Sequence, residues 1–527
     1  MMNKPHSRTV PTLLVEITSR GPEKLILTDG PRSWSYSAFT REVERAARAL
    51  LASGIAHGDR IGLLAGNRAE WLIVDFAAMS IGAIAVGLNT WASARELAYQ
   101  LAHAQVKLLI LEPKFRERDF IALLNEARQL AEELPRLTTV VELTDSEQPE
   151  PEHLSYAKFL QGGSVATSTE LVAASSRVKS DDIACLLYTS GSTALPKGVP
   201  LLHRGLIDNM WEIGERQHLV AGDRLWLAVS LFWSLACVNA VFALVTHGGS
   251  IVLQHHFDAG EALRLIETER CTVFYGTPNM ALALAEHPDR TTRDLSSLRT
   301  GVTIGTPAQV QRVAELGATR ICNVYGLTET YGNSTVADAD LPLARRTETV
   351  GQVLRGNELR ILNPETGAEQ AVGSNGEIVI RGNVTPGYWQ DSARTAEAFA
   401  EGWFHTGDLG FMDAEGYLHY RGRLKEMVKT GGINVAPAEV EEILSAHPAV
   451  ELAFVTGIPD PRLDEALAAV IVARTGQAID EAVLRTHCKA VLAAYKIPRQ
   501  FKFIEASALP LTTTGKLQRN RLPELFS

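Results

Sequence analysis

The spacing of apolar residues alternates between helical and strand-like patterns along the first part of the chain. Over residues 36–53, apolar side chains recur on one helical stripe, which predicts an amphipathic helix. Gly54 and Gly58 interrupt this pattern, and residues 60–64 predict a strand. Residues 69–79 predict the next helix. Strands that alternate with helices are typical of a parallel sheet with helices on both faces.

The alternation continues beyond this region and then changes character twice. Further helices are predicted at 260–268, 278–286 and 307–316, and further strands at 106–111, 183–187, 249–253, 272–275 and 321–324. Gly- and Pro-containing turns separate a set of strands that indicates a small β-rich subdomain, at 358–362, 377–381 and 417–420. A final α+β series follows a helix that begins at Pro437, with elements at 450–455, 466–473, 480–493 and 500–505.

One stretch, Leu227–Val245, is almost wholly apolar and is long enough to cross a bilayer. It contains Ser230, Ser234 and Asn239, and the sequence holds no second stretch of this kind. These features favour a buried strand followed by a core helix over a transmembrane segment.

Composition narrows the class of protein. The 527 residues are 46% hydrophobic and 21% charged, with a net charge of −10, which predicts a globular protein of two or more domains. No basic block occurs, so no nucleic-acid partner is expected. The five scattered cysteines form no Cys-x-x-Cys pair, which favours reduced thiols in a cytoplasmic protein. The polar residues 1–11 lack the apolar segment of a signal peptide.

The loop Tyr188–Val199 is the first candidate for chemistry. Its sequence, Tyr-Thr-Ser-Gly-Ser-Thr-Ala-Leu-Pro-Lys-Gly-Val, combines glycine and small hydroxyl residues with Lys197. Such residues let backbone N–H groups converge on an anion, and the lysine adds a mobile positive charge. The loop does not fit the Walker A pattern, and its composition alone is equally compatible with a surface turn.

Five further motifs follow in the second half of the chain. They are Tyr-Gly-Leu-Thr-Glu at 325–329, Gly-Trp-Phe-His-Thr-Gly-Asp at 402–408, Tyr-Arg-Gly-Arg-Leu-Lys-Glu at 420–426, Lys-Thr-Gly-Gly-Ile-Asn-Val at 429–435 and Pro-Leu-Thr-Thr-Thr-Gly-Lys at 510–516. The first follows a predicted strand, where α/β sheets place ligands, and its carboxylate suits a hard cation. Each motif alone could be a turn or a solvated charged segment, so the evidence for a functional site is the order in which the motifs occur together.

In this order and spacing, the motifs resemble those of the AMP-forming acyl-adenylate enzymes, which include acyl-CoA synthetases, luciferases and peptide-synthetase adenylation domains. The chain is most similar to an acyl-CoA synthetase. The resemblance implies ATP-binding residues Thr189, Ser190, Gly191, Ser192, Thr193, Lys197, Tyr325, Asp408 and Arg423. It implies catalytic roles for Lys516 in adenylation, Thr328 at the α-phosphate and Glu329 as the Mg²⁺ ligand. It further implies a hinge at Lys425 and a coenzyme A tunnel at Gly431 and Gly432.

The same resemblance implies the domain organisation of this α/β protein. Residues 1–424 would form a large N-terminal domain that binds ATP and the acid. It would consist of two layered α/β subdomains and a small β-barrel-like subdomain. Residues 425–527 would form a small, mobile α+β domain that carries Lys516. The N-terminal part, before the loop at 188, matches the family in pattern only.

The acyl pocket is also assigned by resemblance, to Trp233, Thr277, Pro278, Thr303, Gly305 and Leu327. None of these side chains is cationic, which favours a monocarboxylic acid. Trp233 stands where the family often has histidine, and its bulk favours an aryl or a short-to-medium aliphatic acid. A second departure is Ala194, which replaces a family glycine and costs about 1 kcal/mol if that position needs a positive φ.

The expected function is ATP- and Mg²⁺-dependent ligation of such an acid to coenzyme A through an acyl-AMP, in fatty or aromatic acid metabolism. Four alternatives stay open: loading of a carrier-protein phosphopantetheine, amino-acid activation, a light-emitting oxidase, and a non-catalytic AMP-binding scaffold. Residues 230–238 contain no Asp or Glu to pair a substrate ammonium, which argues against amino acids. The intact Glu329, Asp408, Arg423 and Lys516 argue against a scaffold. A monomer and a homodimer are both compatible with the sequence.

Overall fold

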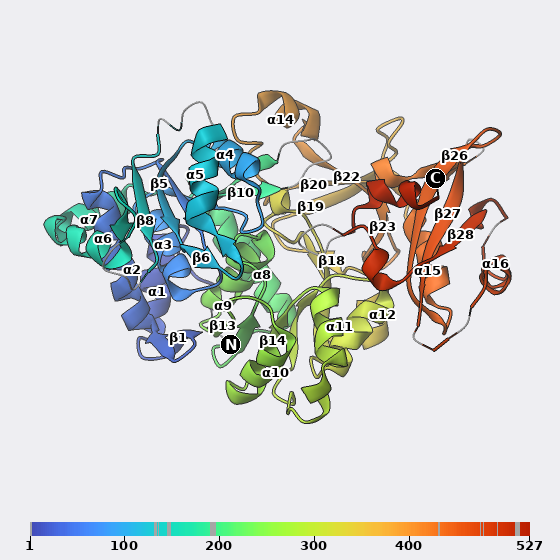
Figure 1. The fold of residues 1–527 in the computed structure, drawn as a ribbon, viewed down its shortest axis with the longest axis horizontal. Coiled ribbons are helices and arrows are strands. Elements are labelled where there is room, and N and C mark those ends of the chain that lie inside the picture. The colour runs from blue at the N-terminus through green and yellow to red at the C-terminus, as the bar shows by residue number, and fades with distance from the viewer. Residues whose placement is uncertain are drawn as a thin grey trace. The chain divides into compact units, whose positions relative to one another are not determined.

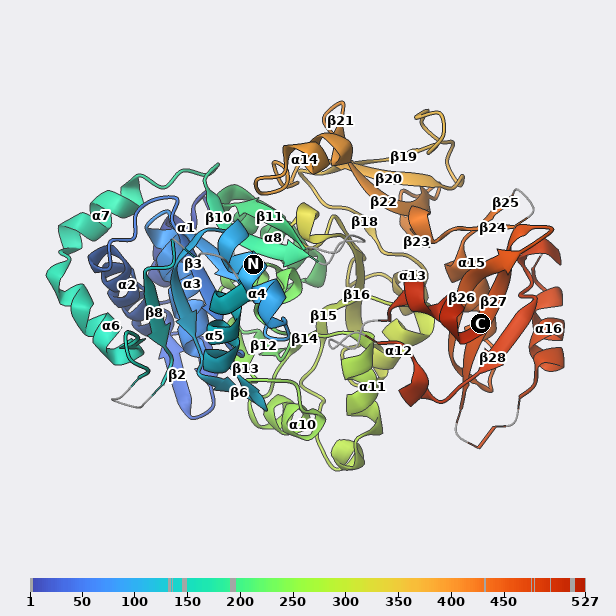
Figure 2. The same cartoon turned by 45° about the horizontal axis from the view of Figure 1, so that its top comes forward.

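The computed structural model describes residues 3–130, 134, 136–144, 149–189, 196–430, 433–474, 476–477, 479–492, 494–511 and 517–526. The chain forms two compact units, Met1–Glu358 with Ile380–Phe404, and Leu359–Val379 with His405–Ser527. Figures 1 and 2 show the helices and strands of both units. The domain boundary after residue 424 stays a prediction.

The first unit is built on two large sheets in which most neighbouring strands run parallel, as the alternating pattern predicts (Figure 1). Within the described residues, one sheet has the order β18-β17-β16-β15-β14-β12-β13-β1-β2 and the other β11-β10-β4-β3-β5-β8-β9. The strands of the first sheet are β1 (Leu25–Asp29), β2 (Arg32–Ser35), β12 (Arg224–Leu227), β13 (Ser250–Leu253), β14 (Val273–Tyr275), β15 (Thr300–Thr303), β16 (Arg320–Tyr325), β17 (Thr335–Val336) and β18 (Gln352–Val353). Those of the second are β3 (Arg60–Leu64), β4 (Ile84–Gly87), β5 (Val106–Leu111), β8 (Thr139–Glu142), β9 (Leu154–Ser155), β10 (Ile183–Thr189) and β11 (Lys197–Leu202), and β6 (Lys114–Phe115) pairs separately with β7 (Arg118–Asp119).

Helices cover both faces of the seven-stranded sheet. On β5, Leu108 and Ile110 belong to the same core as α2 and α3, whereas Leu109 and Leu111 belong to the core of α4 and α5. This split follows from the two-residue period of a strand. The helices of the unit are α1 (Val10–Arg20), α2 (Tyr36–Ala52), α3 (Ala69–Ser80), α4 (Ala94–His103), α5 (Phe120–Leu130), α6 (Tyr156–Gly162), α7 (Ser168–Ser176), α8 (His203–Gln217), α9 (Val241–Thr246), α10 (Ala259–Thr268), α11 (Pro278–Glu286), α12 (Pro307–Glu315), α13 (Leu343–Glu348) and α14 (Ser392–Ala398).

A third sheet has the order β19-β20-β22-β21, with β23 beside β22. Its strands are β19 (Glu358–Leu362), β20 (Gly376–Arg381), β21 (Phe399–Ala400), β22 (Trp403–Met412) and β23 (Leu418–Arg423). The strands at 358–362, 377–381 and 417–420 were expected here. Their described pairing is open and does not close into a barrel, which corrects the expected barrel-like form of this part.

The C-terminal part of the second unit is an α+β assembly, as predicted. Its sheet has the order β25-β24-β27-β26, with β28 parallel to β27. Val440 of α15 and Leu484 of α16 share a core with Leu467 of β27. The elements are β24 (Val428–Thr430), β25 (Ile433–Val435), α15 (Pro437–Ser445), β26 (Val450–Asp460), β27 (Asp464–Ala473), α16 (Glu481–Lys489) and β28 (Gln500–Phe503).

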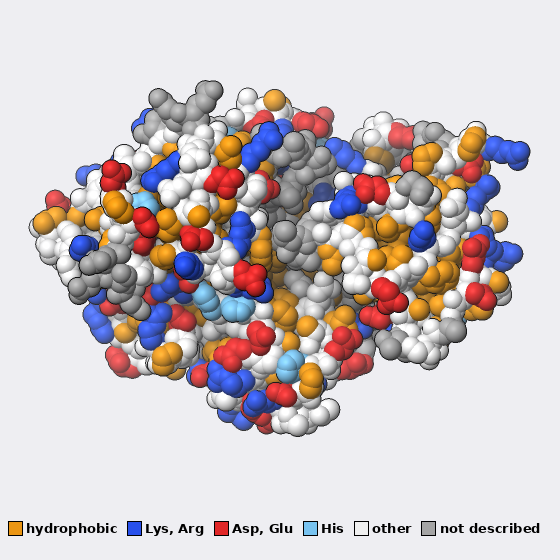
Figure 3. All heavy atoms as spheres, in the orientation of Figure 1, with side chains coloured by type: hydrophobic (Ala, Val, Ile, Leu, Met, Phe, Trp, Pro, Cys, Tyr) orange, Lys and Arg blue, Asp and Glu red, His pale blue; other side chains and the backbone are white. Residues whose placement is uncertain are grey.

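The apolar stretch Leu227–Val245 lies in the core of the first unit. β12 ends at Leu227, so the strand lies almost entirely before the apolar stretch, and only Leu227 belongs to both. A π-helix over Ser234–Ala240 then leads into α9, which confirms the predicted core helix. No helix in the described part of the chain is both long and apolar enough to span a membrane. All five cysteines are buried free thiols, and acidic and basic side chains are interspersed on the face in Figure 3.

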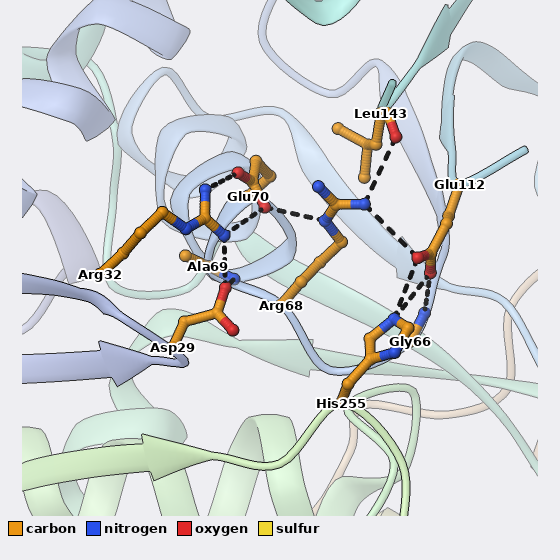
Figure 4. A network of polar contacts seen from close by, with 9 residues as sticks. All are labelled: Asp29, Arg32, Gly66, Arg68, Ala69, Glu70, Glu112, Leu143 and His255. Carbon is orange, nitrogen blue, oxygen red and sulfur yellow. Dashed lines mark hydrogen bonds and ion pairs between the residues drawn. The ribbon is translucent and has the colours of Figure 1, made fainter. Parts of the chain in front are cut away.

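A polar network joins strand ends of the two large sheets (Figure 4). Glu70, at the start of α3, binds Arg32 of β2 and accepts a hydrogen bond of 2.8 Å from Arg68 Nε. Arg68 also contacts Glu112, which follows β5, and Glu112 lies 3.0 Å from His255 Nε2 beyond β13. Burial opposes ionisation of Glu70, but the contacts with Arg32 and Arg68 outweigh it and lower its pKa to about 2.

Replacing Glu70 by glutamine is expected to destabilise the protein at pH 7 by about 2–3 kcal/mol, because a buried carboxylate that accepts hydrogen bonds from Arg32 and Arg68 loses its charge. The folded-state pKa of Glu70 lies below its ordinary value of 4.5, so this stabilisation is complete above pH 4.5. It is lost as the pH falls toward 2. Urea midpoints from pH 7 to pH 3 measure the effect, with Glu261→Gln at an exposed ion pair as the control. Equal midpoints for Glu70→Gln and wild type at pH 7 would refute the role.

Candidate functional site

The Tyr-Gly-Leu-Thr-Glu motif lies at the carboxyl end of β16, as the sequence predicts. Tyr325 is the last residue of β16, and the 3-10 turn Thr328–Thr330 follows. Gly326 is required between them, because a Cβ atom there would lie 2.4 Å from the carbonyl oxygen of Gly332. The turn buries Glu329, which is 6% exposed.

The predicted phosphate loop begins and ends on two paired strands. β10 and β11 are antiparallel, and their last paired residues are Thr189 and Lys197. The ends of the loop are therefore fixed by a ladder of backbone hydrogen bonds. Ser190, Gly191, Ser192, Thr193 and the departure Ala194 lie outside the described residues.

Lys197 and Glu329 meet at a third side chain, Tyr388. The Tyr388 hydroxyl donates a hydrogen bond of 2.9 Å to Glu329 Oε1. The Lys197 ammonium lies 4.7 Å from the centroid of the same ring. A predicted phosphate-binding cation and a predicted metal-binding carboxylate are thus held at one place, although they lie far apart in sequence.

The predicted acyl-pocket residues follow four neighbouring parallel strands in the order β16-β15-β14-β12. Leu327 follows β16, Gly305 follows β15, and Thr277 caps α11 after β14. A Cβ atom on Gly305 would lie 3.2 Å from Pro278 Cγ, so the loops after β14 and β15 are close. Thr303 ends β15 and donates a hydrogen bond of 3.0 Å to the carbonyl oxygen of Gly276. The carboxyl edge of the sheet therefore gathers these residues, as α/β ligand sites require.

Trp233 follows β12 and immediately precedes the π-helix. Its ring centroid lies 5.7 Å from that of Trp91 and 5.6 Å from that of Phe232, which form an aromatic cluster with it. The next residue, Ser234, places its hydroxyl 3.2 Å from Thr328 Oγ1. The Trp233 loop therefore contacts the turn of the predicted α-phosphate residue. Short π-helical segments recur at functional sites because they shift side chains relative to the α-helical repeat.

In the second unit, Asp408 and Arg423 are cross-strand partners on β22 and β23. Arg423 Nε lies 2.8 Å from Asp408 Oδ1, and Asp408 is 2% exposed. The Asp408 amide donates a hydrogen bond of 3.0 Å to Thr406 Oγ1, which fixes the strand locally. Lys425 is exposed in the 3-10 turn Leu424–Glu426 that follows β23. Gly431, Gly432 and Lys516 lie outside the described residues, so their roles stay predictions.

Two features missed by the sequence reasoning lie at this site. Tyr388 is not among the predicted site residues, because nothing in the adjacent sequence indicates its contacts. Ser234 was noted only as a polar residue in an apolar stretch. The sequence signal for Tyr388 is its place between Gly387 and Trp389. In the structure, Gly387 has a positive φ and the Trp389 amide donates a hydrogen bond to the backbone of β11.

One further polar cluster of the described residues contains possible metal ligands. His218, Asp338 and Asp340 could offer three metal ligands, but Arg216 pairs with Asp338 and Arg320 with Asp340. These cations already balance the carboxylates, so the cluster is best explained as ion pairs. A cavity of about 350 Å³ elsewhere in the first unit contains none of the predicted site residues, its lining being Asn3, His6, Ile17, Arg20, Gly21, Lys24, Tyr36, Ala221 and Gly248.

Comparisons with known proteins bear on the family. Residues 15–389 match the family described as AMP-binding enzyme, and residues 439–516 match the AMP-binding enzyme C-terminal domain. YngI of Bacillus subtilis strain 168 is 34% identical over 98% of this chain and 96% of its own. The mitochondrial medium-chain acyl-CoA ligase ACSF2 of Danio rerio is 32% identical over 98% of this chain and 88% of its own.

A solved structure agrees with these sequence relatives. The anthranilate CoA ligase AuaEII in complex with anthranoyl-AMP superimposes with a TM-score of 0.85 at 28% identity, covering 99% of this chain and 97% of that one. Its likeness spans both the large N-terminal part and the small C-terminal part. The motifs, the fold and these full-length relatives together show that the chain belongs to the AMP-binding enzyme family, the AMP-forming ligases that include the acyl-CoA synthetases.

Proposed function

We propose that the protein is an AMP-forming acyl-CoA synthetase that activates a monocarboxylic acid, aryl or short-to-medium aliphatic, in the cytoplasm. One observation carries the proposal. Glu329 and Lys197 contact the same Tyr388, and the Thr328 turn next to Glu329 contacts the loop of Trp233. Groups suited to Mg²⁺, phosphate and an acid therefore converge beside the carboxyl end of β16, where Tyr388 links Lys197 of β11 to Glu329.

The residues fit Mg²⁺ and ATP as ligands. Mg²⁺ binds through one or two carboxylates together with substrate phosphates and water, so the single buried carboxylate of Glu329 is a sufficient protein donor. Bound there, Mg²⁺ would neutralise charge on the phosphates. Tyr325 would stack on adenine, and Asp408 with Arg423 would hold the ribose. The β- and γ-phosphates would bind Lys197 and the loop residues from Thr189 to Thr193.

The first half-reaction would be an in-line displacement. A carboxylate oxygen of the acid attacks the α-phosphorus, the bond to the bridging oxygen breaks, and pyrophosphate leaves. The protein supplies positioning and positive charge rather than a nucleophile. Lys516 would neutralise the attacking carboxylate and the α-phosphate, and Thr328 would donate a hydrogen bond to an α-phosphate oxygen. Ser234, 3.2 Å from Thr328 Oγ1, would orient that hydroxyl.

The second half-reaction would form the thioester. The thiol of coenzyme A loses its proton to solvent, and the thiolate attacks the acyl carbonyl carbon. The bond from that carbon to the phosphate oxygen breaks, and AMP leaves with both electrons of that bond. Rotation about Lys425 would exchange Lys516 for the Gly431–Gly432 loop between the two steps. The full-length similarity to an acyl-CoA ligase and to an anthranilate CoA ligase favours coenzyme A over a carrier protein as the acceptor.

The class of acid is argued from the aromatic cluster. Trp91, Phe232 and Trp233 pack with their ring centroids between 5.3 and 5.7 Å apart and their planes inclined by 43–73°, which offers an aromatic, apolar surface to an aryl or a short alkyl group. The relatives span both possibilities, since one is named for medium-chain acids and the other for anthranilate.

Replacing Trp233 by alanine is expected to raise kcat/KM for a twelve-carbon acid relative to benzoate by about tenfold or more. Removing the indole opens space for additional methylene groups, each worth about 1–3 kcal/mol in an apolar pocket. The ratio of kcat/KM values within each enzyme cancels any general loss of activity. An unchanged ratio would show that Trp233 does not line the acyl pocket.

Pyrophosphate release over a panel of carboxylic acids, with and without coenzyme A, tests the proposed function directly. The expected result is acid-dependent release, with thioester formed only when coenzyme A is present. Acyl transfer to a carrier-protein phosphopantetheine but not to coenzyme A would favour the alternative acceptor. ATP binding without turnover of any acid would instead favour a scaffold.

A further inference from the structure

We propose that Tyr388 is a positioning residue that keeps the Glu329 carboxylate and the Lys197 ammonium separate and correctly placed for MgATP. This inference rests on the proposed function. Tyr388 is 8% exposed and Glu329 6% exposed, so their contact lies largely out of solvent. The phenol donates its one proton to Glu329 Oε1 at 2.9 Å, and its ring face receives the Lys197 cation at 4.7 Å.

The backbone fixes Tyr388 independently of its side chain. The Trp389 amide donates a hydrogen bond of 2.8 Å to the carbonyl oxygen of Gly198, and the Tyr388 amide one of 2.9 Å to Thr395 Oγ1. Thr385 Oγ1 donates to the carbonyl oxygen of Pro200 at 2.7 Å. The segment is thus anchored to β11, directly after Lys197. Shortening the Tyr388 side chain should leave this anchoring in place.

The segment is also anchored to the turn that carries Glu329. The Thr385 amide donates a hydrogen bond of 2.7 Å to the carbonyl oxygen of Glu329, and Thr385 is 1% exposed. Gly387 adopts a φ of +145°, and a Cβ atom there would lie 2.6 Å from Thr395 Cγ2. Only glycine fits this position, which aims the following tyrosine ring at Glu329 and Lys197.

Opposite charges at one place would otherwise pair. Among the described residues, Lys197 and Glu329 form no direct ion pair, and Tyr388 contacts each of them instead. A direct pair would neutralise the carboxylate needed by Mg²⁺ and the ammonium needed by the phosphates. The hydroxyl of Tyr388 occupies one carboxylate oxygen and its ring holds the ammonium, so both charges stay available to the ligand.

The test compares Tyr388→Phe, Tyr388→Leu and a matched control. Tyr388→Phe keeps the ring and removes the hydrogen bond, whereas Tyr388→Leu removes both contacts. Tyr36→Phe is the control, because Tyr36 is 1% exposed and its hydroxyl donates to the carbonyl oxygen of Gly249 away from the site. Calorimetry measures ATP binding at varied Mg²⁺, Mn²⁺ titration by electron paramagnetic resonance reports metal affinity, and steady-state kinetics gives KM values.

Tyr388→Phe is expected to weaken Mn²⁺ binding in the presence of ATP about tenfold, with KM for the acid within about twofold of wild type. Tyr388→Leu should additionally weaken ATP binding measured without metal, and Tyr36→Phe should change none of these values. If Tyr388→Phe binds metal and ATP with wild-type affinity, the inference about Tyr388 is wrong, and the proposed function is unaffected. Wild-type protein that binds no MgATP would overturn the proposed function and the inference with it. If Tyr388→Leu does not fold, the phenylalanine variant decides the question.

Discussion

Replacing Lys516 by alanine is expected to slow acyl-AMP formation by about 10²–10³-fold and to leave thioester formation from supplied acyl-AMP within about twofold of wild type. Adenylation brings a carboxylate against a phosphate, so a lysine ammonium between them stabilises the transition state more than the ground state. Attack of a thiol on the acyl carbonyl needs no such bridge. ATP–pyrophosphate exchange measures the first step, and consumption of synthetic acyl-AMP with coenzyme A measures the second.

Lys502→Ala provides the matched control, because Lys502 is an exposed lysine on β28 of the same unit. It should leave both half-reactions unchanged. Equal losses in the two half-reactions of Lys516→Ala would contradict the assigned division of labour, since they would indicate a general structural defect. The thermal midpoint of the variant distinguishes that defect from a loss confined to adenylation.

The elements predicted from the sequence are those in which buried apolar residues recur at a regular spacing. The helix expected at 36–53 is α2, and its apolar stripe packs in the main core of the first unit. Helix α7 was not predicted, and it has no buried residue to create a period. The π-helix over Ser234–Ala240 also escaped prediction, because a continuous apolar run does not reveal its helical phase. The open third sheet depended on long-range strand pairing, which strand propensity does not fix.

The same limit applies to the candidate site. The motifs identified the chemical groups of the site and the residues that supply them. The structure adds that Asp408 lies opposite Arg423 in a strand register that the motifs alone did not predict. The Tyr388–Glu329 hydrogen bond spans 59 positions, and the Ser234–Thr328 contact spans 94. Contacts between loops of different strands follow from the order of strands in the sheet. A single sequence predicts that such strands exist, but not which loops become neighbours.

Replacing Lys425 by proline is expected to lower thioester formation by roughly 10²-fold while acyl-AMP formation stays within about twofold of wild type. Lys425 is the second residue of the 3-10 turn Leu424–Glu426 and is exposed. First-turn N–H groups have no partner within a helix, so the missing N–H of proline costs little there. Proline fixes φ near −65°, and this removes the backbone rotation that the proposed hinge requires between the two half-reactions.

Lys425→Ala is the matched variant, because it removes the same charge and leaves the backbone free. It should retain both half-reactions, so a loss confined to the proline variant arises from restricted rotation rather than from the lost ammonium. The residue before a proline is driven away from helical backbone angles, so the proline variant could also loosen the turn at Leu424. A thermal midpoint equal to that of wild type excludes this effect. If Lys425→Pro forms acyl-AMP and thioester at wild-type rates, the chain does not rotate at Lys425. The exchange of Lys516 for the Gly431–Gly432 loop would then need a different pivot.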